Sequence, residues 1–237
     1  MTKLLVSVRD STEAHLAWQA GAHLIDVKEP SGGSLGAASH YVLQQVAETM
    51  PPEVLLSAAL GELVDGIDDS VIGLPARFQF AKIGLAGCRV HRGWCGMWAK
   101  VFARLPDATH RVAVAYADWE QAGSPVPADV IRHGADIGCQ VVLIDTFQKK
   151  HGSLLNHLDA TQLAELHSLA RELEMMFVVA GSLDLSTIRE LRCLAPDYFA
   201  VRGAVCRPDR EGPLDIELVH TLLNDLAPSK YQCGDDG

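Results

Sequence analysis

The stretch KLLVSVRDSTEAHLAWQAGAHLIDVK, residues 3–28, contains the unit from which we predict the fold. Two short apolar runs, residues 3–8 and 23–28, flank a segment, residues 11–22, that begins with Ser and Thr and has a Gly near its end. The segment has the start and stop signals of a helix, and the runs are typical of buried strands. Nearly continuous apolar strands that alternate with helices indicate a parallel sheet covered on its outer face.

The same pattern continues along the chain of 237 residues. Six more strand-like runs follow, EVLLSAAL, FQFAKIGL, RVAVAYAD, QVVLIDT, MFVVAGSL and YFAVRGAV, with helical patterns at residues 95–105, 158–174 and 184–195. Eight such units in a chain of this length are typical of an α/β protein with a single (β/α)8 TIM barrel. The competing open doubly wound sheet usually carries GxGxxG in its first turn, which is absent here. We predict one barrel domain over residues 1–226 and a loose tail over 227–237.

Composition and short motifs exclude several classes of protein. A net charge of −10 argues against a general nucleic-acid binder, which neutralises phosphates with clustered Lys and Arg. The start MTKLLVSV has no long apolar segment, and no apolar run approaches the ~18 residues of a membrane span. The cysteines form no CxxC pair and the histidines no HExxH motif, so we expect reduced thiols and no metal or cofactor. We expect a cytoplasmic homo-oligomer.

Ionisable residues end the even-numbered strands of the predicted barrel. In such barrels the catalytic groups come from the carboxyl ends of the strands, and one interior layer comes from alternate strands. The even strands contribute Lys28, Lys82, Asp145 and Arg202. A structural interpretation pairs Lys28 with Asp26, or Lys82 with Asp145. Desolvating several charges costs several kcal/mol per ion, however, and apolar residues would fill a structural layer at lower cost. The cluster therefore indicates catalysis.

Paired lysines favour a narrow range of chemistry. A lysine beside a second cation, or in an apolar pocket, loses basicity and is partly a free amine at neutral pH. A free amine attacks a carbonyl and forms a Schiff base, which stabilises a carbanion at the next carbon. A second lysine and a carboxylate can then move protons. Lys28 is thus predicted to be a nucleophile or a proton shuttle.

The last two strands predict a site for a small phosphorylated substrate. Gly181 and Ser182 precede a helical segment, and Gly203 follows Arg202. Glycine turns at helix starts expose backbone N–H groups, and the loops after strands 7 and 8 of barrels often bind phosphate. Either Arg202 or Arg207 is expected to be the bidentate partner of the phosphate.

Several motifs along the chain, taken together, resemble one family. They read IDVKEPSGGSLGA (25–37), AKIGLAG (81–87), AVAYADWEQ (113–121), LIDTFQKKHGSL (143–154), AGSLDLS (180–186) and VRGAVCRPDR (201–210). In this order they resemble (5-formylfuran-3-yl)methyl phosphate synthase, a barrel enzyme of methanofuran biosynthesis that is also called 4-(hydroxymethyl)-2-furancarboxaldehyde-phosphate synthase. The resemblance covers residue 4 to about residue 226.

The resemblance implies a reaction and a set of roles. Two molecules of glyceraldehyde 3-phosphate would condense to a furan aldehyde phosphate, with loss of phosphate and water. Lys28 would be the Schiff-base lysine and Lys82 a proton-transfer group. Asp145 and Lys149, which match the VDT-x-x-K motif of the family, would assist elimination and phosphate handling.

The chain departs from the family pattern at one position, and at a second position two adjacent lysines could match the motif. Archaeal members carry a lysine four residues after the Tyr of the YADW-type segment, where this chain has Glu120. Lys150 is a second candidate for the role of Lys149, because the two are adjacent. Tyr116 and Asp118 are interpreted as closing strand 5 and are not assigned to the catalytic set.

Two other functions compete with this interpretation. One is another Schiff-base aldolase that acts on phosphorylated sugars or keto acids, which product analysis would distinguish. The other is a non-catalytic barrel that binds a phosphorylated metabolite and regulates a partner. The lysine pair argues against it, because a passive binder needs phosphate donors but no amine of lowered pKa.

Overall fold

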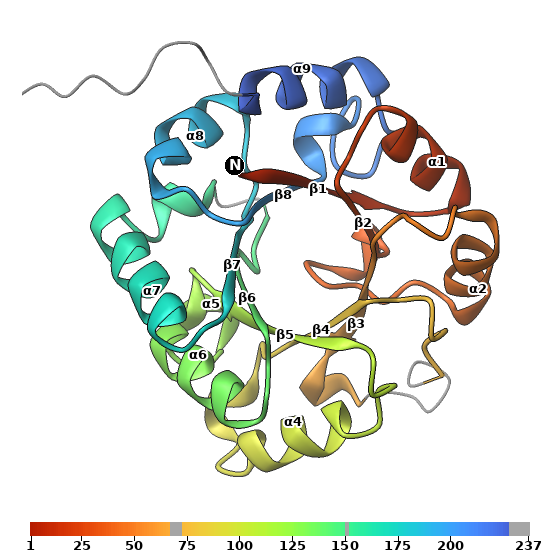
Figure 1. The fold of residues 1–237 in the computed structure, drawn as a ribbon. Helices are drawn as coiled ribbons and strands as arrows, with labels where there is room; N and C mark the ends of the chain where they lie inside the picture. Colours follow the sequence, from red (N-terminus) through yellow and green to blue (C-terminus); the bar gives the residue numbers. More distant parts are fainter. Residues whose placement is uncertain (67–72, 150–151, 228–237) are drawn as a thin grey trace, which may run out of the picture.

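The computed structural model describes residues 1–66, 73–149 and 152–227, in which eight parallel strands close into a barrel in chain order (Figure 1). β1 (Lys3–Val8) pairs with β2 (Leu24–Val27) on one side and with β8 (Tyr198–Val201) on the other. This last pairing closes the sheet, so the predicted (β/α)8 barrel is confirmed and the open sheet is excluded. The predicted tail lies, apart from Ala227, outside the described residues.

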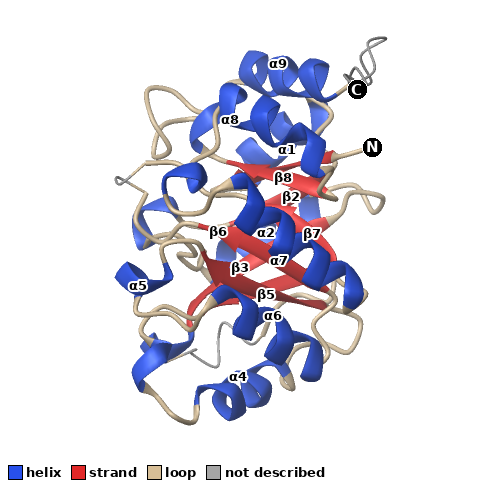
Figure 2. Ribbon diagram, turned by 90° about the vertical axis from the view of Figure 1, so that its left-hand side faces the viewer, coloured by secondary structure: helices blue, strands red, loops and turns tan. Residues whose placement is uncertain are grey.

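The remaining elements alternate along the chain, and the helices surround the barrel (Figure 2). The other strands are β3 (Leu56–Glu62), β4 (Phe80–Gly84), β5 (His110–Tyr116), β6 (Val141–Asp145) and β7 (Met176–Val179). The helices are α1 (Ser11–Gln19), α2 (His40–Thr49), α4 (Trp94–Phe102), α5 (Trp119–Ala122), α6 (Pro127–Asp136), α7 (Ala160–Glu172), α8 (Leu185–Glu190) and α9 (Ile216–Leu226).

Alternate residues of each strand face two different cores, because side chains on a strand have a period of two. In β6, Val142 and Ile144 pack outward in the core between the strands and the helices. Val141 and Leu143 pack inward with apolar side chains from the other strands. Asp145 continues this inward row. An ionisable residue at the end of that row therefore lies at the mouth of the barrel. The even-numbered strands carry their ionisable residues, among them Lys28 and Asp145, in such inward rows.

Two elements differ from their predicted bounds. The segment 184–195 is not one helix, since α8 ends at Glu190 and a separate 3-10 turn, Leu191–Leu194, follows it. The third predicted strand starts at Leu56 instead of residue 53. The preceding residues form a turn in which the N–H of Val54 donates to the carbonyl of Pro51 at 3.1 Å. Neither difference changes the order of the strands.

Candidate active site

A cavity of about 520 Å³ opens at the carboxyl ends of the strands. All eight residues predicted for the site line it: Lys28, Lys82, Asp145, Lys149, Gly181, Ser182, Arg202 and Gly203. They come from five strand ends that are far apart in the sequence. The closed barrel brings them together, and their roles stay predictions.

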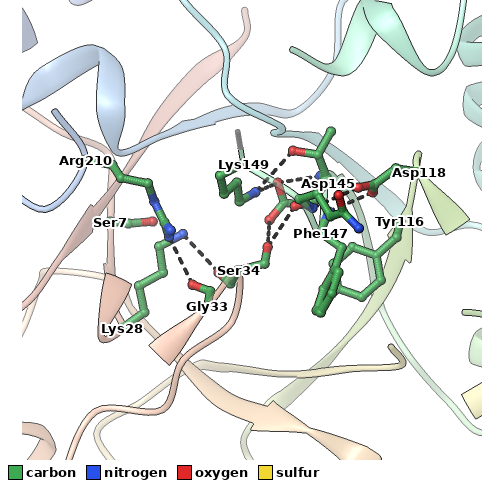
Figure 3. A network of polar contacts seen from close by, with 12 residues as sticks. Ser7, Lys28, Gly33, Ser34, Tyr116, Asp118, Asp145, Phe147, Lys149 and Arg210 are labelled. Carbon is green, nitrogen blue, oxygen red and sulfur yellow. Dashed lines mark hydrogen bonds and ion pairs between the residues drawn. The ribbon is translucent and has the colours of Figure 1, made fainter. Parts of the chain in front are cut away.

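Lys28 follows the last residue of β2 and is buried. Its backbone N–H donates to the carbonyl of Val8 at 3.0 Å, which continues the pairing of β2 with β1. Its Nζ donates to the carbonyl of Ser34 at 3.4 Å, and no described carboxylate forms an ion pair with it (Figure 3). Burial lowers the pKa of Lys28 to about 7, with Asp145 opposing the shift and Lys149 adding to it. At neutral pH a large fraction of this group is a free amine.

Lys82 has a carboxylate partner inside the barrel. Its Nζ lies 2.7 Å from Oδ1 of Asp26, and the hydroxyl of Ser7 donates to Oδ2 of the same carboxylate at 2.9 Å. Burial alone would raise the pKa of Asp26, but the charges of Lys82 and Lys28 outweigh burial and lower it. Both structural pairings considered from the sequence are therefore wrong: Asp26 pairs with Lys82 and not with Lys28, and Asp145 does not pair with Lys82.

Asp145 pairs with Lys149 at 2.5 Å, between Nζ and Oδ1. Its other oxygen accepts a hydrogen bond from the hydroxyl of Ser34 at 2.9 Å. Burial would raise the pKa of Asp145, but Lys149 and Lys28 lower it, so the group is an anion. Burial lowers the pKa of Lys149 against the attraction of Asp145. Lys150, the alternative candidate, lies outside the described residues.

A buried carboxylate that the sequence analysis left aside holds the loop of Lys149. Asp118 accepts hydrogen bonds from the N–H groups of Phe147 and Gln148 at 2.7 and 2.8 Å. It therefore anchors the segment between Asp145 and Lys149 (Figure 3). The signal available in the sequence was an acidic residue just after an apolar strand, in the YADW segment. Ser34 gave no comparable signal, because a Ser in a Gly-rich loop is ordinary.

Two further residues of the YADW segment lie away from the cavity lining. Tyr116 is buried and its hydroxyl donates to Glu62 at 2.5 Å. Burial raises the pKa of both groups. Glu120, the position that departs from the motif, is exposed on α5 and does not line the cavity. The substitution therefore leaves the lining of the cavity unchanged.

The turns after β7 and β8 present backbone donors to the cavity. Gly181 has φ of 100° and Ser182 has φ of 51°, so the chain turns sharply there. A Cβ on Gly181 would lie 3.0 Å from Cγ2 of Thr146, which leaves little room for a side chain. Within the described residues, no acceptor takes the N–H groups of Gly181, Ser182 or Gly203. These donors are available to an anion.

Arg202 is buried in the wall and fully engaged by protein acceptors. It forms an ion pair with Glu13 and donates to the carbonyls of Ser7, Arg210 and Gly212 at 3.2, 2.8 and 2.8 Å. With the second bond to Glu13 at 3.1 Å, all five N–H donors are used. The geometry thus assigns Arg202 to the wall and does not favour it as a phosphate partner.

Arg207, the other arginine considered for the phosphate, lies outside the cavity. It is 66% exposed and pairs with Asp215 at 2.5 Å. Within the described residues, no group of three or more His, Cys, Asp or Glu side chains is arranged to hold a metal ion. No described helix is long and apolar enough to cross a membrane.

The barrel architecture is shared with solved structures. Phosphoribosyl anthranilate isomerases from Thermus thermophilus and Thermotoga maritima superpose with TM-scores of 0.61 and 0.62. Each alignment covers 95% of this chain and 98% of the other, at 15% and 12% identity. At this level of identity the likeness shows the fold alone.

Sequence relatives identify the family. Proteins from Methanococcus maripaludis and Methanopyrus kandleri, both named (5-formylfuran-3-yl)methyl phosphate synthase, are each 32% identical to this chain. The alignments cover 93% and 95% of this chain, and 97% and 99% of the relatives. The family model described as 4-HFC-P synthase matches residues 4–223. Since these matches extend over nearly the whole barrel, the chain belongs to the 4-HFC-P synthase family of enzymes.

Proposed function

We propose that this enzyme condenses two molecules of glyceraldehyde 3-phosphate into (5-formylfuran-3-yl)methyl phosphate through a Schiff base on Lys28. The atoms balance when one inorganic phosphate and two molecules of water are released. Membership of the family supports the product, and the state of Lys28 supports the mechanism. We further propose that the product serves the synthesis of a methanofuran-type one-carbon carrier, as the names and motifs of the family suggest.

One observation carries the mechanism: Lys28 is a buried lysine without a described carboxylate partner, beside two lysines that have one. Its amine attacks the aldehyde carbon of the first substrate, and the carbinolamine loses water to form an iminium ion. Loss of a proton from the neighbouring carbon gives an enamine. The enamine carbon then attacks the aldehyde of the second substrate and forms the new carbon–carbon bond.

The two ion pairs supply the proton transfers. Lys82 is held beside Asp26 at 2.7 Å, and its ammonium group can donate a proton to a departing hydroxyl. Asp145 and Lys149 also line the cavity as a pair, so that the carboxylate can remove a proton and the ammonium can donate one to a leaving phosphate. Water and phosphate leave in these elimination steps, and water that adds to the final iminium ion releases the product from Lys28.

Backbone donors hold a phosphate group in this proposal. The N–H groups of Gly181, Ser182 and Gly203 are not taken by other described residues, and all three residues line the cavity. Exposed N–H groups in a turn form a concave site for an anion. This site would keep the phosphate of one substrate fixed while its aldehyde end reacts.

The test combines product analysis with covalent trapping. The enzyme is incubated with glyceraldehyde 3-phosphate alone, and the product is identified by mass spectrometry and by its furan absorbance. Parallel samples are reduced with sodium borohydride and mapped by peptide mass. We expect the furan product and an adduct on Lys28. An adduct with an open-chain aldol product would instead support another Schiff-base aldolase. The absence of both product and adduct would favour a binding protein.

A further inference from the structure

The cavity is lined by five cationic side chains, of which three are neutralised by the protein. Lys82, Lys149 and Arg202 each form an ion pair with a buried carboxylate. Within the described ranges, Lys28 and Arg210 form no ion pair. Lys28 must be a neutral amine to react as proposed. Arg210 is therefore the remaining cation in the described lining that can neutralise an anionic ligand.

The backbone that carries Arg210 is fixed by contacts that do not use its side chain. Arg202 donates to the carbonyls of Arg210 and Gly212, both at 2.8 Å. Arg9 donates to the carbonyl of Glu211 at 2.6 Å. Arg202 thus holds the loop after β8 in place, which explains why its own donors are all engaged.

The side chain of Arg210 reaches the loop after β2, which also contacts Lys28. Its Nη2 donates to the carbonyl of Gly33, in the loop after β2, at 3.0 Å. Lys28 donates to the carbonyl of the next residue, Ser34, so both side chains contact the same loop (Figure 3). A guanidinium has five N–H donors, so most of the donors of Arg210 have no acceptor among the described residues. A half-buried cation with unused donors is suited to an anion.

The surroundings of Arg210 match a phosphate. A Cβ on Gly203 would lie 3.7 Å from Cβ of Arg210, so the arginine stands next to one of the backbone donors. The carboxylates of the lining attract Arg210 without an ion pair among the described residues: Asp145 and Glu211 act on its charge most, and Asp209 accepts from the N–H of Glu211 at 2.9 Å. Within the described residues, the guanidinium has the Gly33 carbonyl as its hydrogen-bond acceptor and no ion-pair partner.

We propose that Arg210 binds the phosphate of the substrate, exchanging the Gly33 carbonyl for phosphate oxygens. The planar fork of the guanidinium fits two phosphate oxygens at once. Since Arg210 and Lys28 contact adjacent residues of the loop after β2 and line one cavity, Arg210 selects phosphorylated aldehydes at the step in which the imine forms. This inference rests on the proposed function for the identity of the aldehyde. Binding of phosphate itself does not depend on that function.

The first test measures selectivity by trapping. Adducts on Lys28 are formed with glyceraldehyde 3-phosphate or with glyceraldehyde, reduced with borohydride and quantified in the wild type and in Arg210→Gln. We expect Arg210→Gln to raise the half-saturating concentration of the phosphorylated aldehyde about 10- to 100-fold, the usual effect of losing a charged hydrogen bond. The half-saturating concentration of glyceraldehyde should change less than about two-fold, because this aldehyde has no phosphate for Arg210 to bind. For the phosphorylated aldehyde, the half-saturating concentration of Arg210→Lys should lie between those of the wild type and Arg210→Gln.

Arg207→Gln is the matched control, because Arg207 belongs to the same loop but is exposed and pairs with Asp215 outside the cavity. It should behave as the wild type with both aldehydes. Equal losses for the two aldehydes in Arg210→Gln, or no loss for either, would overturn the proposal.

The second test separates this inference from the proposed function. Inorganic phosphate is titrated into the wild type, Arg210→Gln and Arg207→Gln, and its binding is measured by calorimetry without any aldehyde. We expect weaker binding in Arg210→Gln alone. If the wild type forms no adduct, the proposed function fails, but a selective loss of phosphate binding still supports Arg210. Phosphate binding that is equal in all three proteins, or absent from the wild type, rejects it.

Discussion

The ammonium group of Lys82 lies 2.7 Å from the carboxylate of Asp26, and both side chains are buried inside the barrel. Of the three lysines that line the cavity, Lys82 and Lys149 each form an ion pair, and Lys28 forms none with a described residue. Lys82 forms an ion pair with Asp26, whereas burial lowers the pKa of Lys28 to about 7. Two residues of the same type thus become suited to different roles.

Lys28→Arg should abolish turnover while the protein stays folded. Arginine keeps a cation in the site but offers no free amine, because a guanidinium stays protonated. We expect a loss of several orders of magnitude in kcat and no borohydride adduct. Lys82→Arg should lose less, about 10²- to 10⁴-fold, if Lys82 only transfers protons. Turnover assays and mass mapping check both variants, and an adduct that persists in Lys28→Arg would show that the nucleophile is elsewhere.

Asp26→Asn should destabilise the fold strongly. It leaves the buried ammonium of Lys82 without a partner, and breaking a buried ion pair in this way costs about 3–5 kcal/mol. The double variant Asp26→Asn/Lys82→Met should regain much of that loss, because no unpaired charge remains. Urea unfolding of the two variants measures the difference. A double variant no more stable than the single one would show that the charge of Lys82 is not the cause.

The lowered pKa of Lys28 should appear as a pH dependence of stability. Between pH 7 and the ordinary value of 10.5, the unfolded chain binds a proton on Lys28 that the folded protein does not. The free energy of unfolding therefore rises with pH in this window, by up to about 1.4 kcal/mol per pH unit from this group. Lys28→Met lacks this contribution.

Urea unfolding of the wild type and Lys28→Met between pH 7 and 10 isolates that slope from other titrating groups. We expect Lys28→Met to be the more stable protein near pH 7 and its advantage to shrink as the pH rises. Parallel profiles for the two proteins would mean that Lys28 keeps its ordinary pKa in the folded state.

Asp118→Asn should slow turnover by loosening the loop of Lys149. The amide keeps one acceptor oxygen for the two N–H groups of Phe147 and Gln148, and its NH₂ group opposes the other. We expect kcat to fall about 10-fold, comparable to the loss of one charged hydrogen bond. Trapping on Lys28 should be unchanged. Glu120→Gln, at an exposed position nearby, is the control, and an equal loss of trapping and turnover would point to general disruption instead.

The sequence by itself determined the fold and the residues of the cavity. Eight apolar runs separated by helical patterns are typical of a closed parallel barrel. The two-residue period of a strand decides which side chains face the interior of that barrel. Lys28 and Asp145 each continue an inward row. For that reason the charged residues at the strand ends line one cavity, and the loop residues Lys149, Gly181, Ser182 and Gly203 join them because the loops follow the same ends of the strands.

Only the tertiary structure decided which charges pair. Asp26 and Lys28 share one strand face, yet Asp26 pairs with Lys82 of β4, with β3 between the two strands. Close approach depends on how the strands are staggered and not on separation along the chain. The partners of the two arginines were likewise decided by the tertiary structure. Arg202 forms an ion pair with Glu13 from α1, and Arg210 donates to a carbonyl of the loop after β2. A strand fixes the direction of its own side chains, but the partner that meets each one is set by packing between segments distant in sequence.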